Sequence, residues 1–136
     1  MTKVMVFGSF DLVHKGHIYF FKKAKKLGKE LIVIIARNKT IKKFKNKPPL
    51  YDEEQRIQHV KDTNIPDKVI LGHKKDPYKI IREIKPDIIA LGYDQDSFTK
   101  GLEQELKNRN LTNIKITRLK SYKPELYKSS KLKKDY

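Results

Sequence analysis

The sequence predicts an α/β protein: a doubly wound parallel sheet of about five strands with helices on both faces. Short apolar runs rich in β-branched residues alternate along the chain with longer stretches of helical periodicity, which is the pattern of βαβ units. The chain has 136 residues, enough for one domain and too few for two ordinary ones. We therefore expect residues 1–136 to form a single domain.

The first four expected strands are dominated by apolar residues, as in strands that are buried on both faces of a parallel sheet, and the last alternates apolar and polar residues. The expected strands are residues 3–7, 31–36, 68–71, 87–91 and 113–119. Three of them lead into glycine, at Gly8, Gly72 and Gly92, although a simple strand break is an equal alternative for Gly72. Open parallel sheets bind ligands beyond the carboxyl ends of their strands, where glycine lets the backbone approach a phosphate, so we expect the site there.

Helical periodicity fills the segments between the strands. The expected helices are residues 17–27, a helix that begins near residue 52, residues 77–85 and residues 97–108. Gly28 ends the first helix, and Asp52 and Gln55 stand at the spacing of a capping box at the start of the second. We expect a lysine-rich loop at residues 38–50, and a final helix or a frayed end at residues 128–136.

The chain is strongly basic, since 32 Lys and Arg against 16 Asp and Glu give a formal net charge of +16. The positive field of such a charge attracts nucleic acid, anionic membranes or a small substrate with several phosphates. An equal alternative is that most of the lysines are only solvated and bind no ligand. The chain has no cysteine, which excludes disulfides and thiolate metal sites. No apolar run resembles a signal peptide or a membrane span, so we expect a cytoplasmic protein.

Residues 14–17, His-Lys-Gly-His, carry the strongest chemical signal. They lie where the first strand leads into the first helix, and unpaired backbone N–H groups there face an incoming anion. His14 and His17 fall on the same side of the opening turn, and Gly16 removes a side chain that would hinder a phosphate. Such donors can surround an α-phosphate and stabilise the charge that grows as pyrophosphate leaves. Two surface histidines by chance are the less favoured interpretation.

The segment GSFDLVHKGH resembles the GxFDxxHxGH signature of the cytidylyltransferase-like nucleotidyltransferases. The similarity extends over nearly the whole chain, through GHIYFFKKAKKLG, the basic loop, EEQR, ALGYDQ and KSSKL. It implies a small Rossmann-like domain in which His14 and His17 contact the triphosphate and stabilise the transition state. The residues that it implies as a floor beneath the phosphates are Gly8, Ser9 and Phe10. We expect Asp11 to be an internal hydrogen-bonding residue rather than a metal ligand.

The resemblance implies further residues around the triphosphate. Lys45 and Lys47 of the basic loop would clamp the triphosphate or the acceptor phosphate, with Lys47 catalytic, because a lysine places a mobile point charge near leaving pyrophosphate. The other implied residues are Arg56 from the following helix, Gly92 and Asp94 after the fourth strand, and Lys123, Ser129 and Ser130 near the C-terminus. Lys123 stands where the family carries an arginine, so bidentate recognition is lost there.

The signature determines the reaction class better than the substrate. ALGYDQ, residues 90–95, resembles a segment of archaeal FAD synthases, and Asn64 stands where glycerol-3-phosphate cytidylyltransferases carry an arginine. This favours transfer of AMP from ATP to FMN. We expect Mg²⁺ or another divalent cation to bind with the triphosphate, and the family resemblance implies a homodimer. Transfer of CMP from CTP to an acceptor such as glycerol 3-phosphate is the alternative, and the lack of the C-terminal cysteines of the archaeal enzymes counts against the first choice.

An inactive polyanion-binding protein is the alternative outside the enzymes, and the net charge motivates it. The aromatic residues are not interleaved with lysine at the regular spacing of a base-stacking platform. We therefore expect neither a specific nucleic-acid partner nor a membrane partner. The intact His14, Gly16 and His17 favour an active enzyme.

Overall fold

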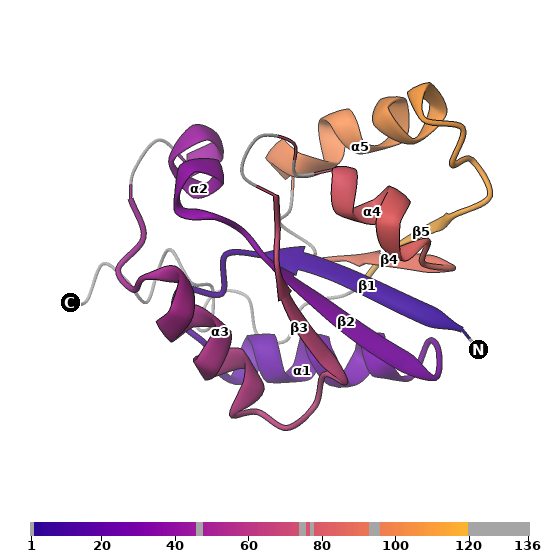
Figure 1. Ribbon diagram of the computed structural model, residues 1–136. Coiled ribbons are helices and arrows are strands. Elements are labelled where there is room, and N and C mark those ends of the chain that lie inside the picture. Colours follow the sequence, from indigo (N-terminus) through magenta and orange to yellow (C-terminus); the bar gives the residue numbers. More distant parts are fainter. Residues whose placement is uncertain (1, 46–47, 74–75, 77, 93–95, 120–136) are drawn as a thin grey trace.

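Five parallel strands form one sheet in the part of the chain that the structure describes (Figure 1). The computed structural model describes residues 2–45, 48–73, 76, 78–92 and 96–119, with the backbone alone at residues 43–45 and 96–100. The strands are β1 (Lys3–Gly8), β2 (Glu30–Ile35), β3 (Lys68–Leu71), β4 (Ile88–Leu91) and β5 (Lys115–Arg118). Their spatial order is β3-β2-β1-β4-β5, so the winding reverses between β1 and β4. The predicted doubly wound parallel sheet is confirmed.

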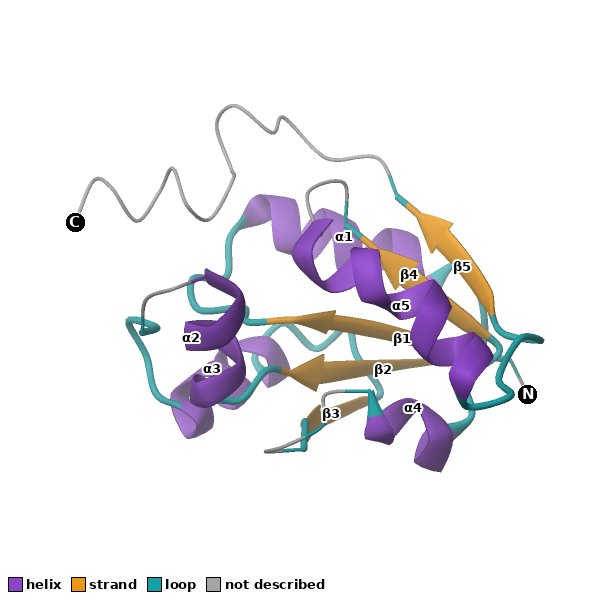
Figure 2. Ribbon diagram, turned by 90° about the horizontal axis from the view of Figure 1, so that it is seen from above, coloured by secondary structure: helices purple, strands orange, loops and turns teal. Residues whose placement is uncertain are grey.

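Helices cover both faces of this sheet. The helices that the structure describes are α1 (Lys15–Lys25), α2 (Asn38–Lys45), α3 (Glu53–Lys61), α4 (Lys79–Ile84) and α5 (Asp96–Asn108). Figures 1 and 2 show α1 and α3 on one face and α4 and α5 on the other, with α2 beyond the carboxyl end of β2. Adjacent parallel strands need crossover connections, which are almost always right-handed. Because the crossovers run in opposite directions along the sheet on the two sides of β1, their helices lie on opposite faces.

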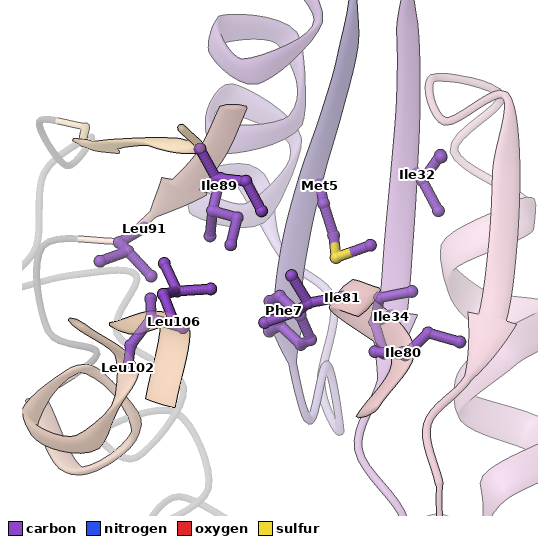
Figure 3. Packing of buried hydrophobic residues seen from close by; sticks show 11 residues of the cluster. Met5, Phe7, Ile32, Ile34, Ile80, Ile81, Ile89, Leu91, Leu102 and Leu106 are labelled. Atoms are coloured by element: carbon purple, nitrogen blue, oxygen red, sulfur yellow. The ribbon is translucent and has the colours of Figure 1, made fainter. Parts of the chain in front are cut away.

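Two apolar cores lie on the two faces of the sheet. Successive side chains of a strand point to opposite faces, so Met5 packs toward α4 and α5 whereas Val4 packs toward α1 and α3. Figure 3 shows the first core, in which Leu102 and Leu106 of α5 lie near Leu91 of β4. Burial on both faces explains why the central strands β1, β2 and β4 are nearly continuous apolar runs, whereas the edge strand β5, KITR, is not.

One predicted element was wrong. Residues 38–50 are not a continuous loop, because Asn38–Lys45 form α2. Ile41 is 4% exposed, and its N–H donates to the carbonyl of Arg37 at 3.0 Å. Ile41 and Phe44 stand three apart, as on one side of a helix, but they are the only two apolar residues among its eight. Lysine forms helices well, yet its repetition here resembled a solvated loop.

The other predicted elements within the described residues have their ends within two residues of the observed ones, and the final helix or frayed end expected at residues 128–136 lies outside the described residues. The predicted capping box of α3 is confirmed, since Asp52 Oδ1 accepts from the N–H of Gln55 at 2.8 Å and Gln55 Oε1 accepts from the N–H of Asp52 at 3.1 Å. The first helix begins at Lys15 rather than at His17, because His14 is its N-cap residue. Both signature histidines therefore belong to the start of α1.

Candidate active site

The candidate site lies at the carboxyl ends of β1 and β4, where the winding of the sheet reverses. These strands pair with Val6 opposite Ala90, so their ends are adjacent. β1 ends at Gly8 and leads through the signature segment into α1, and β4 is followed by Gly92. At such a point, the chain segments that follow the two strands run to opposite faces of the sheet. Open α/β sheets bind ligands in the crevice between these two segments.

The two signature histidines form a capping box at the start of α1. His14 has an extended backbone, and its Nδ1 accepts a hydrogen bond from the N–H of Gly16 at 3.0 Å. In return, Nδ1 of His17 accepts from the N–H of His14 at 3.4 Å. The ring centroids are 4.0 Å apart and the planes are inclined by 34°. The expectation that both imidazoles lie on one side of the opening turn is confirmed.

These hydrogen bonds determine which nitrogen of each ring can donate. Because both Nδ1 atoms accept, each neutral imidazole carries its hydrogen on Nε2. An Nε2–H group is a donor suited to a developing negative charge. The first turn of α1 contains no acidic residue, so no negative side chain there neutralises the positive end of the helix dipole or repels an anion. The start of α1 therefore suits a phosphate.

Phe10 supports His17 from the core side. Its ring is 5% exposed, lies edge-on to the ring of His17 with the centroids 5.3 Å apart, and is tilted against Phe21 at 5.1 Å. The ring also occupies the space beside Gly8, where an added Cβ would lie 2.6 Å from Cζ of Phe10. Phe10 has φ 48°, an unusual backbone angle for a phenylalanine and a form of strain that gathers at functional sites.

Asp11 is an internal hydrogen-bonding residue, as the sequence predicted. It is 1% exposed, and its two carboxylate oxygens accept from the backbone N–H groups of Leu50 at 2.6 Å and Tyr51 at 2.8 Å. Within the described ranges, no group of three or more His, Cys, Asp and Glu side chains could hold a metal ion. Asp11 therefore ties the signature loop to the chain that leads into α3.

Arg56 lies in a different environment from the one expected of a phosphate ligand. It is 0% exposed, and its Nη1 donates to the carbonyls of Ser9 at 3.0 Å and Ala36 at 2.7 Å. Its Nη2 donates to Oδ1 of Asn38 at 2.8 Å, and its Nε donates to the carbonyl of Tyr51 at 3.2 Å. This geometry corrects the expected direct phosphate contact, because the guanidinium is buried and committed to acceptors of the protein itself.

Two polar residues at this edge were not selected from the sequence. Asn38 binds Arg56, and Nη1 of Arg118 donates to the carbonyl of Gly92 at 2.7 Å. The only signal in the sequence that could have indicated them was their position at or just beyond the ends of predicted strands. The predicted site residues outside the described part of the chain are Lys47, Asp94, Lys123, Ser129 and Ser130. Lys45 ends α2, and its side chain is likewise outside the description.

A parallel sheet with a histidine-capped helix at its switch point defines an α/β protein suited to a phosphate-bearing ligand. A family model described as cytidylyltransferase-like matches residues 5–135. The chain belongs to this family. The predicted resemblance is thereby confirmed over nearly the full length.

Proteins named FAD synthase are among its relatives. That of Archaeoglobus profundus is 49% identical over 131 residues, which cover 96% of this chain and 82% of the relative. That of Thermoplasma volcanium is 40% identical over 134 residues, which cover 98% and 93%. A crystal structure from Thermoplasma volcanium GSS1, described as a lipopolysaccharide core biosynthesis protein, has a TM-score of 0.82 and 41% identity, and the match covers 90% of this chain and 98% of that one.

The helices in the described part of the chain offer no candidate for a membrane span, since none is both long and apolar enough.

Proposed function

We infer that this chain is an FAD synthase, a nucleotidyltransferase that transfers AMP from ATP to FMN. The observation that carries this inference is the match to archaeal FAD synthases at 40% to 49% identity over most of both chains. In the reaction, an oxygen of the FMN phosphate attacks the α-phosphorus of ATP and forms a new P–O bond. The bond from that phosphorus to the bridging oxygen breaks, so pyrophosphate leaves and FAD is formed.

The histidine pair acts on the α-phosphate. His14 and His17 donate from Nε2 to its oxygens and stabilise the charge that develops on them, and the tautomers imposed by the capping box support this role. The helix start at Gly16 contributes the positive end of its dipole. Gly8 and Ser9, with Phe10 packed against Gly8, bring the backbone of the signature loop under the phosphates.

The remaining predicted residues close the site around the nucleotide and acceptor. Those assigned to the phosphates are Lys45, Lys47, Lys123, Ser129 and Ser130, and those assigned to the base or the acceptor are Gly92 and Asp94. Their support is the resemblance to the family signature. On the same basis, we take residues 1–136 as one domain that acts in the cytoplasm as a homodimer.

Mg²⁺ enters this scheme as part of the substrate, bound to the phosphates of ATP. Asp11, the acidic residue of the signature, has both oxygens engaged by backbone N–H groups. The described residues contain no cluster of acidic or imidazole ligands that would form a separate metal cage. Mg²⁺ commonly keeps several waters and binds through substrate phosphates, which fits these residues.

The experiment that tests the function pairs each nucleotide with each acceptor. The protein is incubated with ATP or CTP, with FMN or glycerol 3-phosphate, and with Mg²⁺, and both pyrophosphate and the nucleotidylated product are measured. We expect FAD and pyrophosphate in equal amounts from ATP with FMN. CMP transfer to glycerol 3-phosphate without any FAD would contradict the proposal in favour of a cytidylyltransferase. Salt-sensitive polyanion binding without pyrophosphate would contradict it in favour of an inactive binding protein.

A further inference from the structure

One guanidinium joins three segments of the chain, through four acceptors, at the carboxyl edge of the sheet. Arg56 donates to Ser9, which follows β1, to Ala36, which follows β2, to Asn38, which begins α2, and to Tyr51, which precedes α3. The N–H groups of a guanidinium lie in one plane with fixed angles between them. The four acceptors are therefore held in a fixed arrangement relative to one another.

The lysine-rich segment, which we define as α2 together with the residues that follow it as far as Tyr51, is anchored at both ends. At its start, Oδ1 of Asn38 accepts from Arg56 at 2.8 Å. At its end, the N–H groups of Leu50 and Tyr51 donate to Asp11, and the carbonyl of Tyr51 accepts from Arg56. Both ends of the segment are therefore tied to Arg56, and its second end is tied to Asp11 as well.

Fold stability alone is a weak reason for a buried arginine here. Burial lowers the pKa of Arg56, and the negative charge of Asp11 opposes this, so the guanidinium stays charged although it is fully buried. A buried charge has a large desolvation cost, and well-packed apolar residues often stabilise a fold equally well. The precise set of acceptors, which all belong to segments around the phosphate site, therefore points to a role in arranging that site.

We propose that Arg56 is a positioning residue for the nucleoside triphosphate. Through Ser9 it holds the signature loop that carries the histidines, and through Asn38 it holds the lysine-rich segment. The two sides of the triphosphate site thus keep a constant separation before the nucleotide binds. The proposal rests on the proposed function only in taking a nucleoside triphosphate as the ligand.

The Asn38 contact can be removed while Arg56 stays in place. Asn38→Ala deletes the acceptor, and Asn38→Asp keeps an acceptor oxygen. We expect Asn38→Ala to raise the KM and the equilibrium Kd for ATP about tenfold with kcat changed less than about threefold, the scale of one charge-assisted hydrogen bond. Asn38→Asp should restore both constants to within about twofold of the wild type, because the contact is rebuilt with a carboxylate.

Arg56→Lys keeps the charge but cannot reach four divergent acceptors. We expect kcat/KM to fall at least 100-fold, with little further loss when Asn38→Ala is added, because both changes break the same contact. Arg109→Lys is the matched control, since Arg109 binds the carboxylates of Asp76 at 2.7 Å and Glu105 at 3.1 Å and touches none of the segments that Arg56 joins in its described contacts. It should leave kcat and KM unchanged.

A merely structural Arg56 would give a different result. If Arg56→Lys lowers Tm but the folded variant keeps wild-type KM and kcat, or if Asn38→Asp is as impaired as Asn38→Ala, the proposal is overturned. Kd is measured by equilibrium titration with ATP and with CTP, without an acceptor. A wild type that binds ATP and forms no FAD would therefore refute the proposed function while the Kd comparison still tests Arg56. A wild type that binds neither nucleotide refutes both.

Discussion

Replacing Gly8 with alanine tests whether Phe10 supports His17. An added Cβ would lie 2.6 Å from Cζ, 2.8 Å from Cε2 and 3.1 Å from Cε1 of Phe10. Nonbonded carbon atoms prefer separations of about 3.5–4.0 Å, so the ring must move by roughly 1 Å. It has little room, because it is 5% exposed and packs against Phe21 and His17.

The cost of Gly8→Ala follows from this displacement. Overpacking a core costs about 1–3 kcal/mol, and alanine recovers about 0.5–1 kcal/mol of the backbone entropy that glycine loses on folding. The difference spans about 0–2.5 kcal/mol, and because the ring of Phe10 has little room to move we expect the free energy of unfolding to fall by about 1–2.5 kcal/mol. Because the ring of Phe10 contacts His17, a shift of about 1 Å at the histidine is expected to lower kcat by up to about 100-fold.

Urea unfolding followed by circular dichroism measures the stability, and steady-state formation of FAD from ATP and FMN measures kcat. Gly72→Ala is the matched control, since Gly72 also follows a strand and its added Cβ would meet Ile34 and Ile35 at the ordinary distance of 3.5 Å. It should change the unfolding free energy by less than about 0.5–1 kcal/mol and leave kcat intact. Wild-type stability and kcat in Gly8→Ala would refute the reasoning.

Three further outcomes are expected. His17→Ala should lower kcat by about two to four orders of magnitude in a folded protein, because a donor to the transition state is lost, and near-normal turnover would contradict its role. Lys47→Ala should mainly raise the KM for ATP, which steady-state kinetics would show, and an unchanged KM would remove Lys47 from the site. Hydrogen bonds from Lys25 and then from the N–H of Leu31 hold the pKa of Asp67 below its ordinary value, so its stabilising contribution is present above about pH 4 and is lost as the pH falls through the lower folded-state pKa. Asp67→Asn should therefore be less stable than the wild type in urea unfolding at pH 7, and this difference should shrink toward pH 3; a pH-independent difference would exclude the ionised carboxylate as its source.

Local patterns in the sequence predicted the elements that carry the site. Apolar runs predicted the strands, and a strand followed by two histidines at one-turn spacing predicted that the imidazoles lie together at the start of a helix. Asp52 and Gln55 predicted the start of α3 for the same reason, since a capping box depends on residues three apart. Each of these features is decided by neighbours within a few residues.

The environment of Arg56 could not be predicted in this way. Its acceptor Ser9 is 47 residues away in the sequence, and Ala36 and Asn38 are 20 and 18 residues away. An arginine is usually exposed, and only the arrangement of separate segments of the chain buries this one. The helix α2 was missed for a different reason: Ile41 and Phe44 do stand at helical spacing, but two apolar residues among many lysines resembled a solvated loop.

The sequence by itself determined the α/β class, the nucleotidyltransferase signature and the pairing of His14 with His17, because short-range periodicity and spacing encode them. Only the tertiary structure decided that Arg56 and Asp11 hold the site from within. The physical reason is that a hydrogen bond between distant segments depends on where the packed sheet and helices place the two groups.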